Sequence, residues 1–167
     1  MKKIVFLVLV SMTLVGCLGN RSNIALNSEF RPKEAMYIFT VGRASISGQA
    51  FVRTADGKIH PARNSKVTLV PATAYAQERI NAIYNGKRGA NRVVKFPNAD
   101  PRYHYFTRKT TADAKGNFSF VDIAGGDYYI TTNVVWGGRN GKAQSLIERV
   151  TVNDNGKVKV TLSGSAS

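Results

Sequence analysis

A series of short apolar segments separated by turn signals constrains the fold of this chain more than any other feature. The segments are rich in β-branched and aromatic residues, and several alternate polar with apolar positions, which favours β-strands. Strands are therefore predicted at 36–41, 46–54, 66–70, 102–111, 118–121, 128–136, 145–152 and 157–162. Because they recur at near-regular spacing with no long helices between them, we predict an all-β, antiparallel sandwich rather than a parallel α/β sheet.

One stretch has a helical period instead. Its apolar positions would share one helix face: Ala76, Ile80 and Ile83. Thr73 is a suitable N-cap, and the Asn and Gly that follow Tyr84 would end the helix. We therefore predict one short helix over 73–85. The residues at 86–102, where glycine, proline and asparagine are frequent, are predicted to form a loop.

Two short patterns identify positions in the core. Phe118 and Phe120 lie two residues apart, so both side chains would face the same side of a strand. Tyr128 and Ile130 have the same spacing. We interpret these aromatic residues as core rather than as a ligand cage. Gly116, just before the first pair, suits a hairpin position with a positive φ.

The N-terminus has the pattern of an export signal. Lys2 and Lys3 precede an apolar run over 4–15, which is too short to span a bilayer but has the length of a signal-peptide core. The run ends in four residues that resemble the bacterial lipobox: Leu14-Val15-Gly16-Cys17. The resemblance implies that the leader 1–16 is removed and that Cys17, the single cysteine, is acylated. The alternative is a buried N-terminal helix.

The segment after the lipobox is predicted to be a tether. Residues 17–35 are rich in Asn, Ser and Gly and have no clean period, so we expect a flexible coil between the lipid and a domain that begins at residue 36. Leu18 follows the lipidated cysteine, and in enteric-type sorting an Asp at that place retains the protein at the inner membrane. We therefore expect this palmitate-bearing chain on the periplasmic face of the outer membrane.

Between Ser45 and Trp136 the order of features resembles the carboxypeptidase regulatory-like family, whose domain is a transthyretin-like (prealbumin-type) β-sandwich. The matching stretches are Ile46-Ser47-Gly48-Gln49-Ala50, Asp56-Gly57-Lys58, 61–69, 110–120 and 123–130. The more specific half is the turn with Gly116, the Phe-x-Phe pair and the Gly-x-Tyr that follows. The resemblance implies a single domain over 36–163, with a frayed tail at 164–167, in a family that serves mostly as structural or interaction appendages.

The chain departs from that family in a long insertion between 73 and 103. From Arg79 to Lys109 there are eight basic residues and one acidic residue, with aromatic residues interleaved. The candidate anion- or partner-binding residues are Arg79, Lys87, Arg88, Arg92, Lys95, Arg102, Arg108 and Lys109. The formal net charge of +14 likewise suggests an anionic neighbour. The alternatives are that the charge serves solubility alone, and that the insertion is a solvated flap whose aromatics pack on the sandwich.

No motif in the sequence indicates catalysis. His60 and His104 have no metal-ligating neighbours at useful spacing, and no Ser elbow or phosphate-cradling glycine loop is present. The aspartates next to turn glycines suit local backbone hydrogen bonds. We therefore predict a protein that is not an enzyme and that has no cofactor and no metal.

Two functions follow from these observations. The first is a lipid-anchored, non-catalytic module that acts in envelope structure, scaffolding or protein interaction. The second is a binder of an anionic envelope molecule, such as lipopolysaccharide, phospholipid or another polyanion, through the basic 79–109 segment together with the loop at 137–142. Nucleic acid is not an expected partner of an exported protein.

Overall fold

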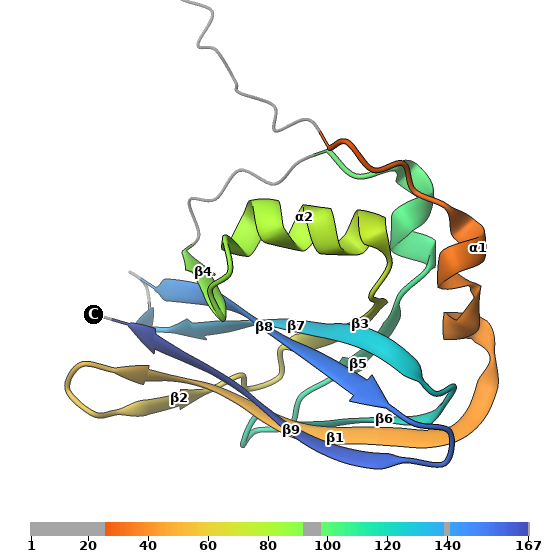
Figure 1. The fold of residues 1–167 in the computed structure, drawn as a ribbon. Helices are drawn as coiled ribbons and strands as arrows, with labels where there is room; N and C mark the ends of the chain where they lie inside the picture. The colour runs from red at the N-terminus through yellow and green to blue at the C-terminus, as the bar shows by residue number, and fades with distance from the viewer. Residues whose placement is uncertain (1–25, 92–97, 139–140, 167) are drawn as a thin grey trace, which may run out of the picture.

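The computed structural model describes residues 26–91, 98–138 and 141–166, and two β-sheets pack face to face in it (Figure 1). The prediction of an all-β sandwich is confirmed. One sheet contains β1 (Val41–Thr54), β2 (Ile59–Pro61), β6 (Asn117–Ile123) and β9 (Lys157–Ala166). In this four-stranded sheet β6 and β2 follow one another along one edge of β1, and β9 pairs with the opposite edge.

The other sheet contains five strands. They are β3 (Lys66–Pro71), β4 (Gly89–Asn91), β5 (Arg108–Thr111), β7 (Gly126–Trp136) and β8 (Lys142–Val152), in the order β4-β8-β7-β3-β5. The predicted leader, Cys17, Leu18, Arg92 and Lys95 lie outside the described residues. None of the helices in the described ranges has the length and apolar character needed to span a membrane.

The core between the sheets follows the predicted alternation. Phe118 and Phe120 are both buried there, as are Tyr128 and Ile130. The Tyr128 hydroxyl donates a hydrogen bond to the carbonyl oxygen of Ala124 at 2.8 Å, so the buried phenol has a partner. The paired core residues predicted from their spacing are confirmed.

A third layer covers the outer face of the five-stranded sheet. The helix α2 (Ala74–Tyr84) lies across that face in Figure 1. Its predicted N-cap is confirmed, since Thr73 Oγ1 accepts from the backbone N–H of Ala76 at 3.2 Å. Asn85 ends the helix in a left-handed conformation with φ +46°. The predicted apolar face is buried.

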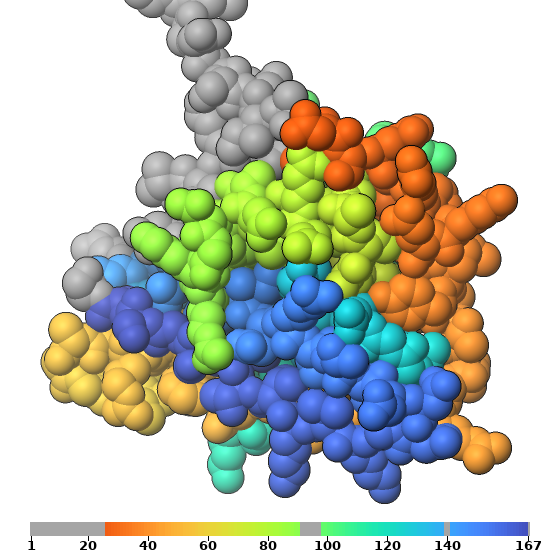
Figure 2. Space-filling model, viewed as in Figure 1, coloured from red at the N-terminus to blue at the C-terminus, as the bar shows by residue number. Residues whose placement is uncertain are grey.

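The segment before β1 corrects two predictions, and its first part, residues 26–35, lies beside α2 in this layer (Figure 2). Phe30 is only 3% exposed, and α1 (Pro32–Ala35) and η1 (Met36–Phe39) follow it as short helical turns. The described residues 26–35 are therefore packed structure rather than tether. The strand predicted at 36–41 is also wrong, because a short apolar run does not distinguish a strand from a buried turn of helix.

Three further strand boundaries differ from prediction. The strand predicted at 102–111 is η2 (Pro101–Tyr105) followed by β5, where Pro101 favours the helical start. β4 lies inside the predicted loop and pairs with β8. The tail predicted to fray continues β9 to Ala166, because residues up to that point pair with β1. That pairing is parallel, so the sandwich is not purely antiparallel.

Candidate functional site

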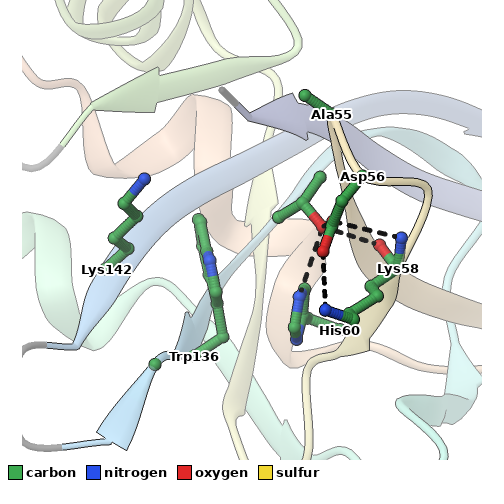
Figure 3. A pocket seen from close by; sticks show the side chains of 8 residues that line it. Ala55, Asp56, Lys58, His60, Trp136 and Lys142 are labelled. Atoms are coloured by element: carbon green, nitrogen blue, oxygen red, sulfur yellow. Dashed lines mark hydrogen bonds and ion pairs between the residues drawn. The ribbon is translucent and has the colours of Figure 1, made fainter.

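A hollow of about 430 Å³ lies at one end of the sandwich (Figure 3). This volume falls within the roughly 300–1,000 Å³ typical of ligand sites. We call it the Trp136 pocket, and it is lined by Thr54, Ala55, Asp56, Lys58, His60, Trp136, Gly137 and Lys142. In Figure 3 the turn between β1 and β2 supplies one wall, and the ends of β7 and β8 supply the other.

Strand register explains why these side chains converge. Val52 pairs with His60 and is fully buried in the sandwich core, so Thr54, two residues on, projects from the same face of the hairpin. On the other sheet Trp136 pairs with Lys142 and lies two residues after the buried Val134, so it faces the same side. Both walls are therefore inner-face positions that extend beyond the packed core, and the pocket is the open end of the sandwich interior.

A tight turn fixes the polar wall. Gly57 has φ +81°, a conformation that glycine adopts without strain, and the N–H of Thr54 donates to the carbonyl of Lys58 at 2.9 Å. The Asp56 carboxylate accepts from the Lys58 ammonium at 2.7 Å and from the Thr54 hydroxyl at 2.5 Å. These two hydrogen bonds hold the pKa of Asp56 well below its usual range, so it is ionised at neutral pH.

The protonation of one histidine nitrogen follows from the same network. Nε2 of His60 lies 3.5 Å from Thr54 Oγ1, a long hydrogen bond. The other neighbours of that hydroxyl, the Asp56 carboxylate and the Lys58 carbonyl, are both acceptors, and its single hydrogen is directed to the closer one, the Asp56 carboxylate. We therefore assign the hydrogen of the His60 contact to Nε2, which donates to Thr54.

Trp136 supplies the apolar part of the pocket. Its ring packs partly against the core and lies nearly parallel to the imidazole of His60, with an interplanar angle of 22° and centroids 5.7 Å apart. In Figure 3 the indole stands between Lys142 and His60. The arrangement offers an aromatic surface with polar groups on either side, which suits a ligand that has both a carbon skeleton and many oxygens.

The predicted basic residues do not gather into one patch among the described residues. Arg79 is buried in α2, and its guanidinium lies over the Tyr103 ring at 5.4 Å. Arg102 forms a two-bonded ion pair with Asp100, at 2.8 and 3.0 Å. Arg108 donates to two backbone carbonyls at the end of β6, so it links the two sheets.

The other described bases lie on two flanks of α2. Lys109 lines a hollow of about 210 Å³ between α2 and strands β3, β5 and β7, together with His104 and Arg79. Lys87 and Arg88 line a separate hollow of about 170 Å³ on the β8 side of the helix. Arg88 also approaches Glu148 at 3.7 Å. The anion-binding role of this segment stays a prediction, and the geometry divides its residues among several environments.

The residues of the Trp136 pocket were not predicted as a site. Asp56-Gly57 has the composition of a tight turn, and His60 has no metal-ligating neighbour at useful spacing, so neither marks a site in the sequence. The sequence did contain one signal, which is a tryptophan at the end of a strand, just before a glycine-rich loop. At the end of a sandwich such a large aromatic side chain leaves apolar surface exposed to water, which is unfavourable. The predicted loop at 137–142 does contribute Gly137 and Lys142 to the pocket.

No group of three or more His, Cys, Asp or Glu side chains is arranged to hold a metal ion in the described part of the chain. No protein-family model matches the chain, and no curated protein sequence matches it either.

A solved structure is similar to this one. It is the crystal structure of a "putative carbohydrate binding protein" from Pseudomonas aeruginosa, with a TM-score of 0.69 and 29% sequence identity. The match covers 81% of this chain and 98% of the other. The similarity supports the sandwich fold. The description of the similar protein names binding, and this is compatible with a non-catalytic binding module in the present chain.

Proposed function

We propose that this chain is a cell-envelope lipoprotein that binds carbohydrate without transforming it, and that the Trp136 pocket is the binding site. One observation carries the proposal: an indole ring at the open end of the sandwich is flanked by polar and charged side chains. Sugar rings have an apolar C–H face and a rim of hydroxyls, so they suit an aromatic surface with hydrogen-bonding groups around it.

The similar Pseudomonas structure adds support, since its description names carbohydrate as the ligand of that protein. The exported, lipidated N-terminus expected from the sequence would place the pocket where polysaccharides occur. In this proposal the acyl chains on Cys17 hold the protein to the periplasmic face of the outer membrane. Two or more chains are needed for stable anchoring.

The pocket carries its own probe, because Trp136 is the single tryptophan of the chain. The mature lipoprotein, purified in mild detergent, is titrated with a panel of neutral and acidic polysaccharides while indole fluorescence is recorded. We expect a saturable change with at least one of them. Affinity electrophoresis of the same protein in gels that contain the polysaccharide gives an independent measure.

Substitution assigns the binding to the pocket. Trp136→Ala should weaken retardation in affinity electrophoresis at least tenfold, because it removes the aromatic surface. Val135→Ala is the matched control, since Val135 precedes Trp136 in β7, faces the opposite side of the sheet and is 61% exposed. Binding by Trp136→Ala equal to that of the unmodified protein would exclude this site.

The anchor is tested separately. Metabolic labelling with an alkyne fatty acid should mark the unmodified protein and not Cys17→Ser, which should leave the membrane fraction. Crosslinking of intact cells with both proteins then tests for an envelope protein partner that depends on membrane placement. Labelling of Cys17→Ser equal to the unmodified protein would contradict lipidation at this residue.

A further inference from the structure

Large apolar side chains are exposed together at the end of the sandwich where β1 begins. They are Met36 and Phe39 of η1, Val41 at the start of β1 and Tyr105 of η2, and each is more than half exposed. They make up four of the seven large hydrophobic side chains that are exposed in the described residues. We call these four residues the apolar patch. Apolar surface gathered in one place is characteristic of contact with a membrane or with another protein.

The elements that carry the patch give it a defined direction. Met36 and Phe39 are three residues apart in a 3₁₀ turn, so their side chains lie one above the other. Ile38 of the same turn is buried in the core, and the other two therefore point away from it. The Phe39 ring contacts the ring of Phe106 with centroids 5.1 Å apart, and Tyr105 precedes Phe106 in the chain. The two segments thus present one apolar surface.

Basic side chains flank the patch. Lys33 lies one turn before it on the same face of the helical segment, Arg43 follows it in β1, and both are exposed. Arg31 and Glu34 form an ion pair at 3.7 Å, so residues 31–43 keep a formal excess of two positive charges. Long basic side chains can lie along apolar surface while their charged groups reach lipid phosphates, and they are attracted to an anionic leaflet.

The expected anchor lies close to this part of the chain. Nine residues separate Cys17 from Leu26, where the described structure begins, and even fully extended they would reach only about 30 Å. The Glu78 carboxylate fixes residues 27 and 28 over α2, and the chain then runs directly into α1 and η1. A lipid on Cys17 would keep the domain beside the bilayer, where even a weak contact forms often. The tether therefore favours a bilayer over a protein as the occupant of the patch.

Resting on the lipid anchor of the function proposed above, we propose that the apolar patch lies on the phospholipid leaflet and fixes the orientation of the domain. β1 runs for 14 residues from Val41 in the patch to Thr54 in the Trp136 pocket (Figure 1). A strand of this length spans about 40 Å. With the patch on the bilayer, the pocket stands at the far end of the sandwich, away from the headgroups and open to polysaccharide.

Tryptophan probes at the two ends of the sandwich test this orientation. Phe39→Trp and Ile59→Trp, each combined with Trp136→Phe, place a single indole in the patch or at the pocket end, at positions of nearly equal exposure. The mature chain, produced without its leader, is coupled through Cys17 to maleimide lipid in vesicles of phosphatidylcholine with a minor fraction of phosphatidylglycerol. Brominated acyl chains quench an indole only at short range. They should lower the fluorescence of Phe39→Trp at least about twofold and leave Ile59→Trp unchanged.

A second measurement needs neither the anchor nor a new tryptophan. The Cys17→Ser chain is sedimented with the same vesicles, and Met36→Ser with Phe39→Ser should lower the bound fraction at least about fivefold. The matched control is Ile59→Ser with Val135→Ser, which removes two exposed apolar side chains from the pocket end and should bind as the parent does. Neither pair of substitutions alters the net charge, so charge alone cannot produce the difference.

Docking and anchoring fail separately in these experiments. Absence of fatty-acid labelling at Cys17 in cells would overturn the anchor, whereas quenching of Phe39→Trp in the coupled vesicles would still support docking through the patch. Equal quenching of both probes, or of neither, overturns the docking whatever the state of Cys17 in cells. An equal loss of binding in the two serine pairs also overturns it. If neither probe is quenched and the Cys17→Ser chain does not sediment with vesicles, the patch is instead a contact for a protein.

Discussion

The interior of the sandwich and the layer over its outer face are both well buried, yet they are built from different kinds of sequence. The interior is formed by strand residues, mostly aliphatic, that alternate with exposed positions. The outer layer centres on Phe30, whose ring meets the rings of Tyr75, Tyr103 and Phe106 at centroid distances of 5.3–5.7 Å. Edge-to-face contacts of this kind favour a defined geometry over loose packing.

The difference lies in how each region holds its place. Interior residues sit on hydrogen-bonded strands, so losing one side chain weakens a sheet that has many other contacts. The outer layer is assembled from segments far apart in sequence: 26–35, α2 and 98–106. They are joined mainly through rings and a few polar contacts, such as that of the Glu78 carboxylate with the backbone N–H groups of Asn27 and Ser28. We therefore expect the outer layer to open locally before the sandwich unfolds.

The largest effect should come from the interior. Phe120 is 4% exposed between the sheets, and Phe120→Ala should lower the free energy of unfolding by about 3–5 kcal/mol. Urea denaturation followed by circular dichroism measures this. Phe120→Leu, which keeps most of the volume, should recover more than half of the loss. A cost below about 1 kcal/mol would mean that the interior is not the cooperative core.

The matched change in the outer layer is Phe30→Ala. Phe30 is as buried as Phe120, so a large cost of about 3 kcal/mol is expected, but with a different distribution. Amide hydrogen exchange should accelerate in α2 and η2 and stay slow in β7 and β8. Phe39→Ala, at a residue more than half exposed, is the control. Uniform acceleration through both sheets would show that the two regions unfold as one unit.

Alkaline pH should weaken the outer layer, and the interior as well, because burial also raises the pKa of Tyr128 between the sheets. Burial raises the pKa of Tyr84 to about 12 and that of Tyr103 to about 12, whereas an unfolded tyrosine titrates near 10. Above pH 10 the unfolded chain loses protons that the folded state keeps. The stability from these tyrosines is thus present below pH 10 and is lost as the pH rises through about 12.

Tyr84→Phe should therefore flatten the decline in unfolding free energy between pH 10 and 11.5, by about 2 kcal/mol at the upper limit. Urea titrations at several pH values measure the slope. Tyr105→Phe, at a residue that is 75% exposed, is the control. A slope in Tyr84→Phe equal to that of the unmodified protein would contradict a buried neutral phenol at this position.

The smallest effect concerns the start of α2. Thr73→Ala removes the oxygen that accepts from the N–H of Ala76, and should cost about 1 kcal/mol. Thr73→Ser should restore it. If the outer layer is a separate unit, hydrogen exchange should report this cost in α2 and not in the strands. Loss of the same size in Thr73→Ser would indicate that the methyl group, rather than the cap, is what matters.

The sequence was most informative where one local rule decides the structure. The period of two at Phe118 and Phe120, the N-cap at Thr73 and the positive φ of Gly116, which is +81°, were all predictable from neighbours within a few residues. The outer layer was not, because nothing local indicates that Phe30 meets Tyr103. The alternative prediction for the insertion was a flap whose aromatic residues pack on the sandwich. It is correct for Tyr103, which is buried in the outer layer.

The candidate site was hidden for a similar reason. His60 and Trp136 are 76 positions apart, and neither belongs to a recognisable site motif in its own segment of the sequence. Only the sandwich brings the end of β7 over the hairpin of β1 and β2. Charge counting pointed instead to the 79–109 segment, where counting cannot tell a buried Arg79 or a paired Arg102 from a base that faces solvent.

The parallel pairing of β9 with β1 sets an order on how this protein reaches its native state. Residues 45–54 find their partners at 157–166, more than a hundred positions later, so the pair closes one of the longest loops in the chain. A chain that emerges from the ribosome N-terminus first presents β1 early and β9 late. Until β9 arrives, one edge of β1 is open to pairing with another chain. Folding to the native state should therefore be slow and dependent on the last strand.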